Sequence, residues 1–210
     1  ILFVGTKKNA KNIVQEEADK CSMYYVVERW LGGTLTNYST IRKSIKRLML
    51  LEKESSPLYD NATKKEILSL EREMIRLQDL HRGIKDMKGL PDAIFVVDTY
   101  QESIAVDEAK LLNIPVVAIV DTNSNPNLID YPIPANDDSI RAVKLIVSEI
   151  SKAICESKSI AYPEGKVSLE EAVPEEEDLS NETEMGDESE IAGSDGKQIE
   201  ELVVDSSKED

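Results

Sequence analysis

PDAIFVVDTYQESIAVDEAKLLNIPVVAIVD, residues 91–121, is the stretch that decides the fold. It contains two unbroken apolar runs, at residues 94–97 and 116–120. Runs of this length are typical of strands that are buried on both faces, as they are in a parallel sheet. Apolar residues between the two runs recur at near-helical spacing among polar ones. The stretch therefore predicts a strand, a helix and a second strand, which is the βαβ unit of an α/β protein.

An aspartate follows each of these strands, Asp98 after the first and Asp121 after the second. In open α/β sheets ligands bind at the carboxyl ends of the strands, where both side chains are expected. Aspartate is also common in turns and at helix N-termini, because its carboxylate accepts hydrogen bonds from backbone N–H groups. The sequence leaves both roles open.

Charge divides the chain into two parts. Residues 158–210 hold 4 Lys against 18 Asp and Glu, a net charge of −14. Residues 1–157 hold 21 Lys and Arg against 23 Asp and Glu, a net charge of −2. We therefore predict an α/β domain over 1–157 and a disordered acidic C-terminal tail over 158–210. Ile1 already belongs to a strand pattern, so we expect further sequence before it.

Patterns outside the central stretch complete the predicted domain. Further strands are expected at 1–5 and 24–27, and a short edge strand is expected within 129–135 because Pro132 and Pro134 interrupt that run. Helices are predicted at about 8–21 and 139–157. The prediction is a Rossmann-like parallel sheet flanked by helices.

A helical hairpin is predicted over about residues 36–89, after the second strand. Apolar residues step by three and four along 36–54 and again from Ile67 to Ile84. Two such seams joined by a short connection predict an antiparallel coiled coil inserted into the sheet domain. His81, the only histidine, lies on the second seam and is expected to be packed there rather than catalytic.

The stretch ERWLGGTLTN, residues 28–37, is the most unusual in the chain. Arg29 can form paired hydrogen bonds with a phosphate, and Trp30 can stack on a base. Hydroxyl and amide groups for further contacts come from Thr34, Thr36 and Asn37. The alternative is a structural loop with Trp30 in the core.

Basic residues on two other segments extend this candidate RNA-binding surface. A stripe on the helix after the loop consists of Arg42, Lys43, Lys46 and Arg47, and no acidic residue occurs from position 34 to 51. Lys7 and Lys8 follow the first strand at the start of a helix, where a phosphate can bind. If about six phosphates are contacted, an increase in salt from 50 to 200 mM should lower the affinity for RNA by about three decades. Solvated lysines in a tight turn are the alternative at positions 7 and 8.

Catalytic, metal and cofactor sites are not predicted. Neither G-x-G-x-x-G nor G-x-x-x-x-G-K-[ST] occurs, and no nucleophile has a recognisable base. The aspartates of the 121–138 loop can gather around a divalent ion, but caps and turns explain them as well. The two cysteines lack metal-type spacing and no apolar run approaches about 18 residues, so a cytosolic protein without a membrane partner is expected. A Rossmann-like module that binds a nucleotide or sugar phosphate remains the alternative function.

Four motifs resemble the bacterial second small-subunit ribosomal protein family. They are L-F-V-G-T-K at 2–7, R-W-L-G-G-x-L-T-N at 29–37, P-D-A-I-F-V-V-D at 91–98 and I-P-x-N-D-D at 133–138. The chain departs from the family pattern at both ends. It lacks the family's N-terminal part with its His-Phe-Gly-His-type segment, and its acidic tail is not part of the pattern.

The resemblance implies a structural role in translation and no enzymatic activity. The chain would be a constituent of the small ribosomal subunit in the cytoplasm. It would bind small-subunit ribosomal RNA and support the docking of neighbouring small-subunit ribosomal proteins, including the first, which captures messenger RNA. No cofactor, small-molecule substrate or membrane partner is implied. Some eukaryotic-type relatives serve as adhesion or receptor proteins, but the bacterial form of the hairpin disfavours that role here.

Overall fold

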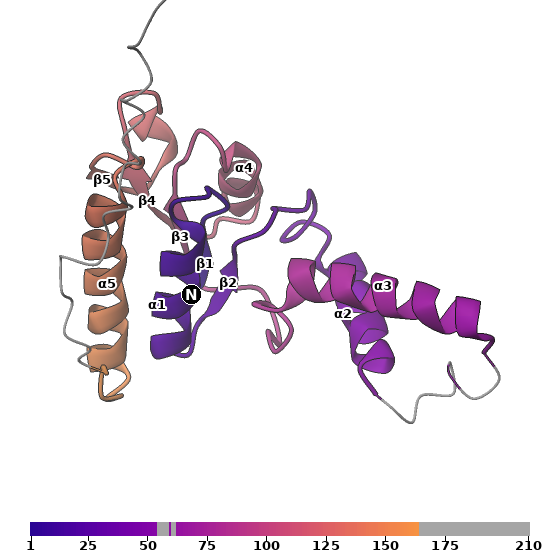
Figure 1. Cartoon of the computed structure of the whole chain (residues 1–210). Coiled ribbons are helices and arrows are strands. Elements are labelled where there is room, and N and C mark those ends of the chain that lie inside the picture. The colour runs from indigo at the N-terminus through magenta and orange to yellow at the C-terminus, as the bar shows by residue number, and fades with distance from the viewer. Residues whose placement is uncertain (54–58, 60–61, 164–210) are drawn as a thin grey trace, which may run out of the picture. The chain divides into compact units, whose positions relative to one another are not determined.

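The structure, a computed structural model, describes residues 1–53, 59 and 62–163 (Figure 1). The chain divides into two units, 1–173 and 174–210, and every described residue belongs to the first. The predicted disordered tail therefore lies outside the described residues, except for its first six positions. The domain boundary predicted at 157 stays a prediction.

Five parallel strands form one sheet in the order β2-β1-β3-β4-β5. Their bounds are β1 Leu2–Val4, β2 Tyr24–Val26, β3 Ile94–Val97, β4 Val116–Val120 and β5 Tyr131–Pro134. The order reverses between β1 and β3, as in doubly wound sheets. This confirms the α/β class and the predicted strands, including the short edge strand that contains Pro132 and Pro134.

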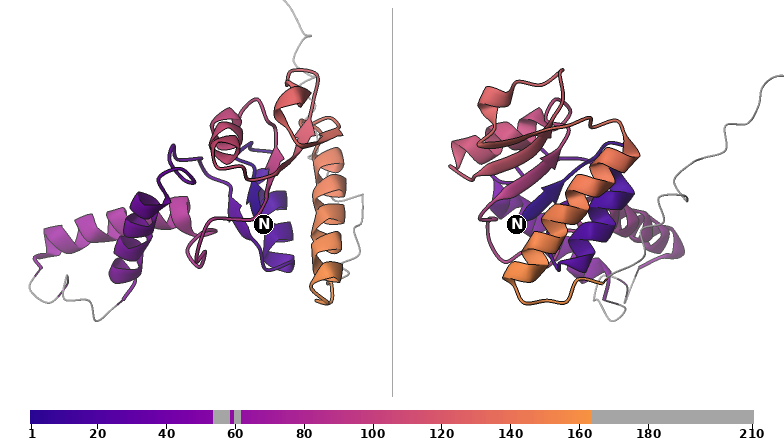
Figure 2. Two further views of the ribbon diagram at one scale, coloured as in Figure 1. Left: turned by 180° about the vertical axis from the view of Figure 1, so that it is seen from behind. Right: turned by 90° about the vertical axis from the view of Figure 1, so that its left-hand side faces the viewer.

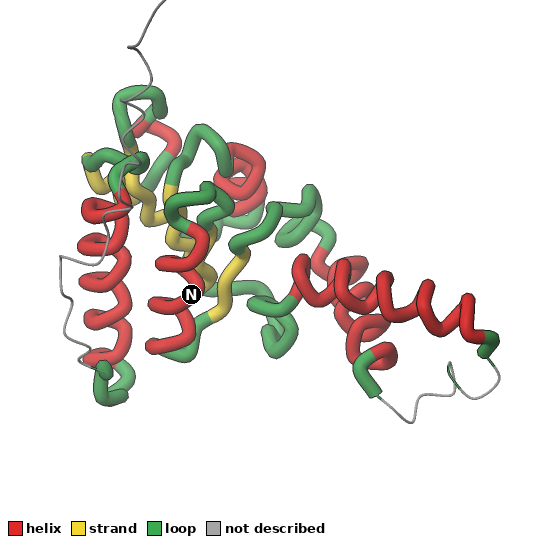
Figure 3. The backbone as a smooth tube through the Cα atoms, in the orientation of Figure 1, coloured by secondary structure: helices red, strands yellow, loops and turns green. Residues whose placement is uncertain are grey.

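Helices cover both faces of this sheet (Figures 1 and 3). Their bounds are α1 Lys11–Lys20, α2 Tyr38–Leu51, α3 Lys64–His81, α4 Ser103–Leu111 and α5 Ile140–Ser157, with a 3₁₀ turn η1 at Pro126–Leu128. The first helix begins later than predicted, because residues 7–10 form a turn held by the carbonyl of Lys7, which accepts from Ala10 and Lys11.

Alternating strand residues divide the interior into two apolar clusters. Phe3 and Phe95 face α1 and α5, which lie side by side in the right-hand view of Figure 2. Their ring centroids are 5.4 Å apart. On the opposite face, Val96 and Ala118 belong to the cluster that contains α4 and the first turns of α2. Period-two alternation in a sheet buried on both faces explains why these runs are apolar throughout.

Helices α2 and α3 pack together through a small apolar cluster of Leu48, Leu51 and Leu77. His81 is buried beside them, with its Nε2 2.9 Å from Ser44 Oγ, so the expected packing role is confirmed. Ile84 was predicted on the helical seam, but α3 ends at His81, and Ile84 instead joins the core under the sheet. The coiled-coil geometry itself stays a prediction.

Gly83 brings the segment after α3 against the edge strand β2. The Gly83 carbonyl accepts from Tyr25 N at 3.1 Å, which supplies the outer edge of β2 with a partner. A Cβ built on Gly83 would lie 2.1 Å from Tyr25 O and 2.4 Å from its ring. Only a residue without a side chain permits this approach of two backbones.

We expect Gly83→Ala to lower the free energy of unfolding by about 3 kcal/mol, because the clash is with backbone and cannot be relieved by a rotamer change. Gly89→Ala is the matched control, since nothing lies within 4 Å of a Cβ at that position. Urea unfolding of the two variants measures the difference. Equal midpoints would contradict the close contact between Gly83 and β2.

Candidate nucleic-acid interface

The loop at residues 29–37 folds around one buried carboxylate, that of Glu108 on α4. Glu108 Oε1 accepts from Trp30 Nε1 at 3.2 Å and from Gly33 N at 2.7 Å. Glu108 Oε2 accepts from Leu35 N, Thr36 N and Thr36 Oγ1 at 2.9, 3.0 and 3.1 Å. The two glycines of the motif are not equivalent, because only Gly33 has a positive φ, of 90°. That conformation lets its N–H turn towards the carboxylate.

This arrangement keeps Glu108 ionised although it is buried. Burial by itself raises the pKa of Glu108, but the hydrogen bonds from Thr36, Gly33, Leu35 and Trp30 together hold the pKa below its ordinary value. Trp30 lies in the sheet core with 7 % of its surface exposed. The loop is therefore fixed to α4 at several points, and the adjacent Arg29 extends from a rigid base.

Arg29 is exposed, and the acidic residue beside it is already paired with other cations. Glu28 forms ion pairs with Lys11 of α1 and, at 3.0 Å, with Arg82 beyond α3. Arg29 itself has no ion pair or hydrogen bond with any described residue. Lys8, which follows the neighbouring strand β1, is exposed in the same way. Parallel strands end at the same edge of the sheet, so Lys8 and Arg29 belong to that edge.

Helix α2 presents the predicted basic stripe, but only one of its four cations has an acidic partner among the described residues. Arg42, Lys43 and Lys46 are exposed and unpaired with respect to the described part of the chain. Arg47 forms a two-point ion pair with Glu73 of α3, at 3.1 Å from Nε and 3.0 Å from Nη2. This pair joins α2 to α3, so Arg47 has a structural partner, whereas the other three have none in the described part of the chain.

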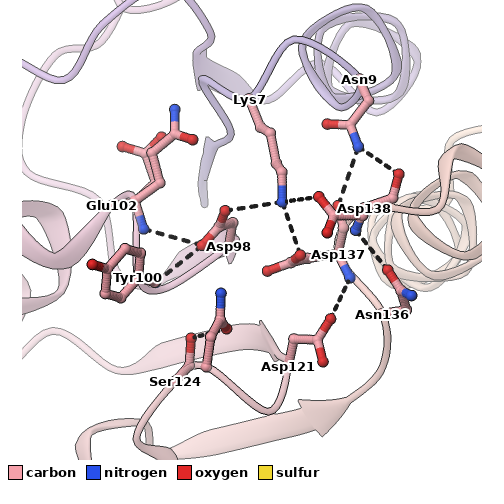
Figure 4. Close-up of polar contacts among 12 residues, drawn as sticks. Lys7, Asn9, Asp98, Tyr100, Glu102, Asp121, Ser124, Asn136, Asp137 and Asp138 are labelled. Atoms are coloured by element: carbon pink, nitrogen blue, oxygen red, sulfur yellow. Dashed lines mark hydrogen bonds and ion pairs between the residues drawn. The ribbon is translucent and has the colours of Figure 1, made fainter.

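Lys7 lies at the centre of an acidic cluster where the strand order reverses (Figure 4). Its Nζ is 3.2 Å from Asp98, 2.9 Å from Asp137 and 2.5 Å from Asp138. Burial lowers the pKa of Lys7, but the hydrogen bonds to Asp138, Asp137 and Asp98 outweigh it and raise the pKa above its ordinary value. The ammonium joins the carboxyl end of β3 to the segment before α5.

Both strand-end aspartates accept hydrogen bonds from backbone N–H groups of the loops around them, which is the turn-forming role left open above. Asp98 has a φ of 67°, and its Oδ1 accepts from the N–H groups of Tyr100 and Gln101. Asp121 accepts from Thr122 N at 2.6 Å and from Asp137 N at 3.4 Å. These bonds close the loops after β3 and β4 and place the partners of Lys7 (Figure 4).

The eleven predicted RNA-binding residues therefore fall into two groups. Six have partners within the protein. Lys7, Trp30, Thr36 and Arg47 bind carboxylates. Thr34 donates to Leu31 O, and Asn37 accepts from a nearby hydroxyl. Five are exposed and have no partner among residues 1–53, 59 and 62–163; these five, the free cations, are Lys8, Arg29, Arg42, Lys43 and Lys46.

In residues 1–53, 59 and 62–163, no group of three or more His, Cys, Asp or Glu side chains has a geometry that could hold a metal ion. Asp130, one of the loop aspartates considered for such a site, instead accepts from Val116 N at 2.8 Å. Among the helices of these ranges, none is both long and apolar enough to cross a bilayer.

Sequence reasoning did not assign a role to Glu108, although a signal was present. Ala105 and Ala109 are fully buried on α4, and Glu108 lies on the same helical face. A charged residue on a buried face requires a partner, because burial of an unpaired charge is costly. The partners of Lys7 gave no comparable signal, since Asp137 and Asp138 are 130 and 131 residues away in sequence.

A family model agrees with these motifs and with the α/β domain that carries them. The model described as Ribosomal protein S2 matches residues 1–157, which include every described helix and strand and all eleven candidate residues. The match covers 157 of the 210 residues of the chain. The chain belongs to the ribosomal protein S2 family, a family of structural proteins of the small ribosomal subunit that are not enzymes.

Proposed function

We propose that the chain binds small-subunit ribosomal RNA through the five free cations and, as a fixed part of the subunit, supports the docking of neighbouring proteins, including the first small-subunit ribosomal protein. The observation that carries the proposal is the absence of an acidic partner for these cations among the described residues, although the domain is slightly acidic overall. The other basic side chains in the predicted set, Lys7 and Arg47, are paired.

The two groups have different roles in this proposal. The free cations contact phosphates, which position the protein on RNA and carry little sequence information. Thr36 and Asn37 are exposed and can add contacts at the start of α2. Lys7, Trp30, Thr34 and Arg47 act indirectly, because they hold the loops and helices that carry the free cations.

The alternative of nucleotide or sugar-phosphate binding has less support. The point where the strand order reverses is the usual ligand site, and there the Lys7 ammonium already has three carboxylate partners. A cavity of about 660 Å³ between the β3–α4 loop and the segment after β4 includes Gln101, Asp107 and Asn125 in its lining. None of its lining residues is a lysine or arginine, so the cavity offers a phosphate no side-chain cation.

Salt dependence of binding tests the proposal. Five phosphate contacts predict that log affinity falls with log salt with a slope of about −4 to −5. Affinity for a small-subunit RNA fragment should therefore fall by between about two and three decades from 50 to 200 mM salt. Fluorescence anisotropy of a labelled fragment measures the slope. An affinity that does not change with salt would contradict phosphate binding by these side chains.

A further inference from the structure

A cavity of about 260 Å³ lies between α2 and the segment 85–88 that follows the hairpin, and it combines apolar and basic walls. Its apolar part consists of Ile45, Met49 and Met87. Ile45 and Met87 are buried in the core beneath the sheet, and Met49 packs against that core while remaining partly exposed. Two methionines give this wall a polarisable surface of the kind that packs well against a ring.

Cations surround this apolar wall. Arg42, Lys46 and Lys88 line the cavity, are exposed and have no ion pair with any residue that the structure describes. Lys85 also lines it, but its ammonium is paired with Glu52. A single acidic residue, Asp86, belongs to the lining. A ligand that enters here therefore meets an apolar surface and an excess of positive charge beside it.

Hydrogen bonds hold the two walls of the cavity in place without a ligand. Tyr38 Oη of α2 donates to Met87 O at 2.5 Å, and Tyr24 Oη of β2 donates to Asp86 O at 3.4 Å. The segment 85–88 is thereby fixed to α2 and to the edge of the sheet. A preformed site loses less entropy on binding than one that must first close.

We propose that this cavity binds one unpaired nucleobase of RNA while Arg42, Lys46 and Lys88 bind the phosphates on either side of it. The inference rests on the proposed RNA-binding function and adds a preference to it. Nucleotides combine a flat apolar ring with an adjacent anion, which matches an apolar wall surrounded by cations. A base within a duplex is stacked and paired, so only a bulged or single-stranded base can enter.

The volume favours a single base over a larger occupant. Cavities for drug-sized ligands span about 300–1,000 Å³, and this one lies just below that range. An acidic peptide with an apolar anchor is the competing occupant. The three unpaired cations on one small cavity favour the regularly spaced charges of a nucleic-acid backbone, because each flanking phosphate then finds a cation.

The test compares two RNA hairpins that differ at one position, using the full chain. One hairpin carries a single bulged adenosine, and the other carries an abasic nucleotide at the bulge, so that both have the same number of phosphates. We expect the adenosine hairpin to bind about tenfold more tightly, since stacking of one base contributes about that much. Equal affinities for the adenosine and abasic hairpins would overturn the inference. If binding of both hairpins still depended steeply on salt, the proposed RNA-binding function would stand.

Two single variants test whether the preference for adenosine arises at this cavity. Met49→Gln keeps the charge and approximate size of the side chain, so it should abolish the preference for the adenosine hairpin over the abasic hairpin. Leu50→Gln is the matched control, because Leu50 is the next residue of α2 and is exposed; it should preserve the preference. A preference that survives Met49→Gln would place the base elsewhere and overturn the inference. Displacement of the adenosine hairpin by an acidic leucine-containing peptide, with no adenosine preference, would also overturn it.

Discussion

Replacement of Glu108 by alanine should lower the free energy of unfolding by about 4 kcal/mol. The variant removes the one acceptor shared by five donors, which come from Trp30, Gly33, Leu35 and Thr36. Loss of one partner from a buried charged network costs about 3–5 kcal/mol, because the remaining groups are left without partners and without water. The loop should open, and Arg29 should lose its fixed position.

Trp30 is the only tryptophan, so its fluorescence reports on this loop directly. Urea unfolding followed by tryptophan emission and by circular dichroism measures the change. Asp107→Ala is the matched control, because Asp107 is the preceding residue of α4 and is exposed; its effect should stay within about 0.5 kcal/mol. An unfolding midpoint in Glu108→Ala equal to that of the control would refute the loop anchor.

The pH dependence of this difference follows from the lowered pKa of Glu108. Because the pKa is lower in the folded protein than in the unfolded chain, the ionised carboxylate stabilises the fold above its ordinary pKa of about 4.3. This stabilisation is lost as pH falls from there through the lower folded pKa. The wild type should therefore approach the stability of Glu108→Ala in acid, whereas at neutral pH the two differ most.

Reversal of two charges on α2 should weaken RNA binding by about a hundredfold. In Arg42→Glu with Lys46→Glu, two of the five free cations are replaced. Hydrogen bonds to charged groups contribute about 1.5 kcal/mol each at the low end, and 1.4 kcal/mol corresponds to tenfold in affinity. The slope of log affinity against log salt should also become shallower by about two, because each lost phosphate contact removes about one unit.

A control with the same change in net charge separates local contact from general repulsion. Arg141→Glu with Lys144→Glu replaces one arginine and one lysine on α5, which covers the opposite face of the sheet from α2. This pair should lower affinity only a few-fold and leave the salt slope close to that of the wild type. Equal losses in the two double variants would show that net charge, rather than the α2 face, governs binding.

Local sequence patterns were sufficient to predict the sheet and most helices. The apolar runs at 94–97 and 116–120 became β3 and β4, and Pro132 and Pro134 correctly marked an edge strand. The end of α3 was missed because Ile84 continues the helical spacing, although the chain has already turned. Close contact between Gly83 and Tyr25 is made across the fold and leaves no mark in that spacing.

The candidate site was predictable as a set of residue types and less so as a set of contacts. The stripe on α2 follows from helical periodicity, and three of its four cations are exposed as expected. The pairing of Arg47 with Glu73 and of Lys7 with Asp137 depends on tertiary proximity, which periodicity does not encode. A large aromatic side chain such as Trp30 suits both core packing and base stacking, so the sequence alone could not decide between these two roles.

Co-sedimentation on a sucrose gradient tests the central claim most directly. The tagged chain should migrate with the small ribosomal subunit in a cell lysate, and the Arg42→Glu, Lys46→Glu variant should shift to the top of the gradient while the α5 control remains bound. A wild-type chain that stays at the top as free protein, in cells that lack a native copy, would contradict the proposed role in the small subunit.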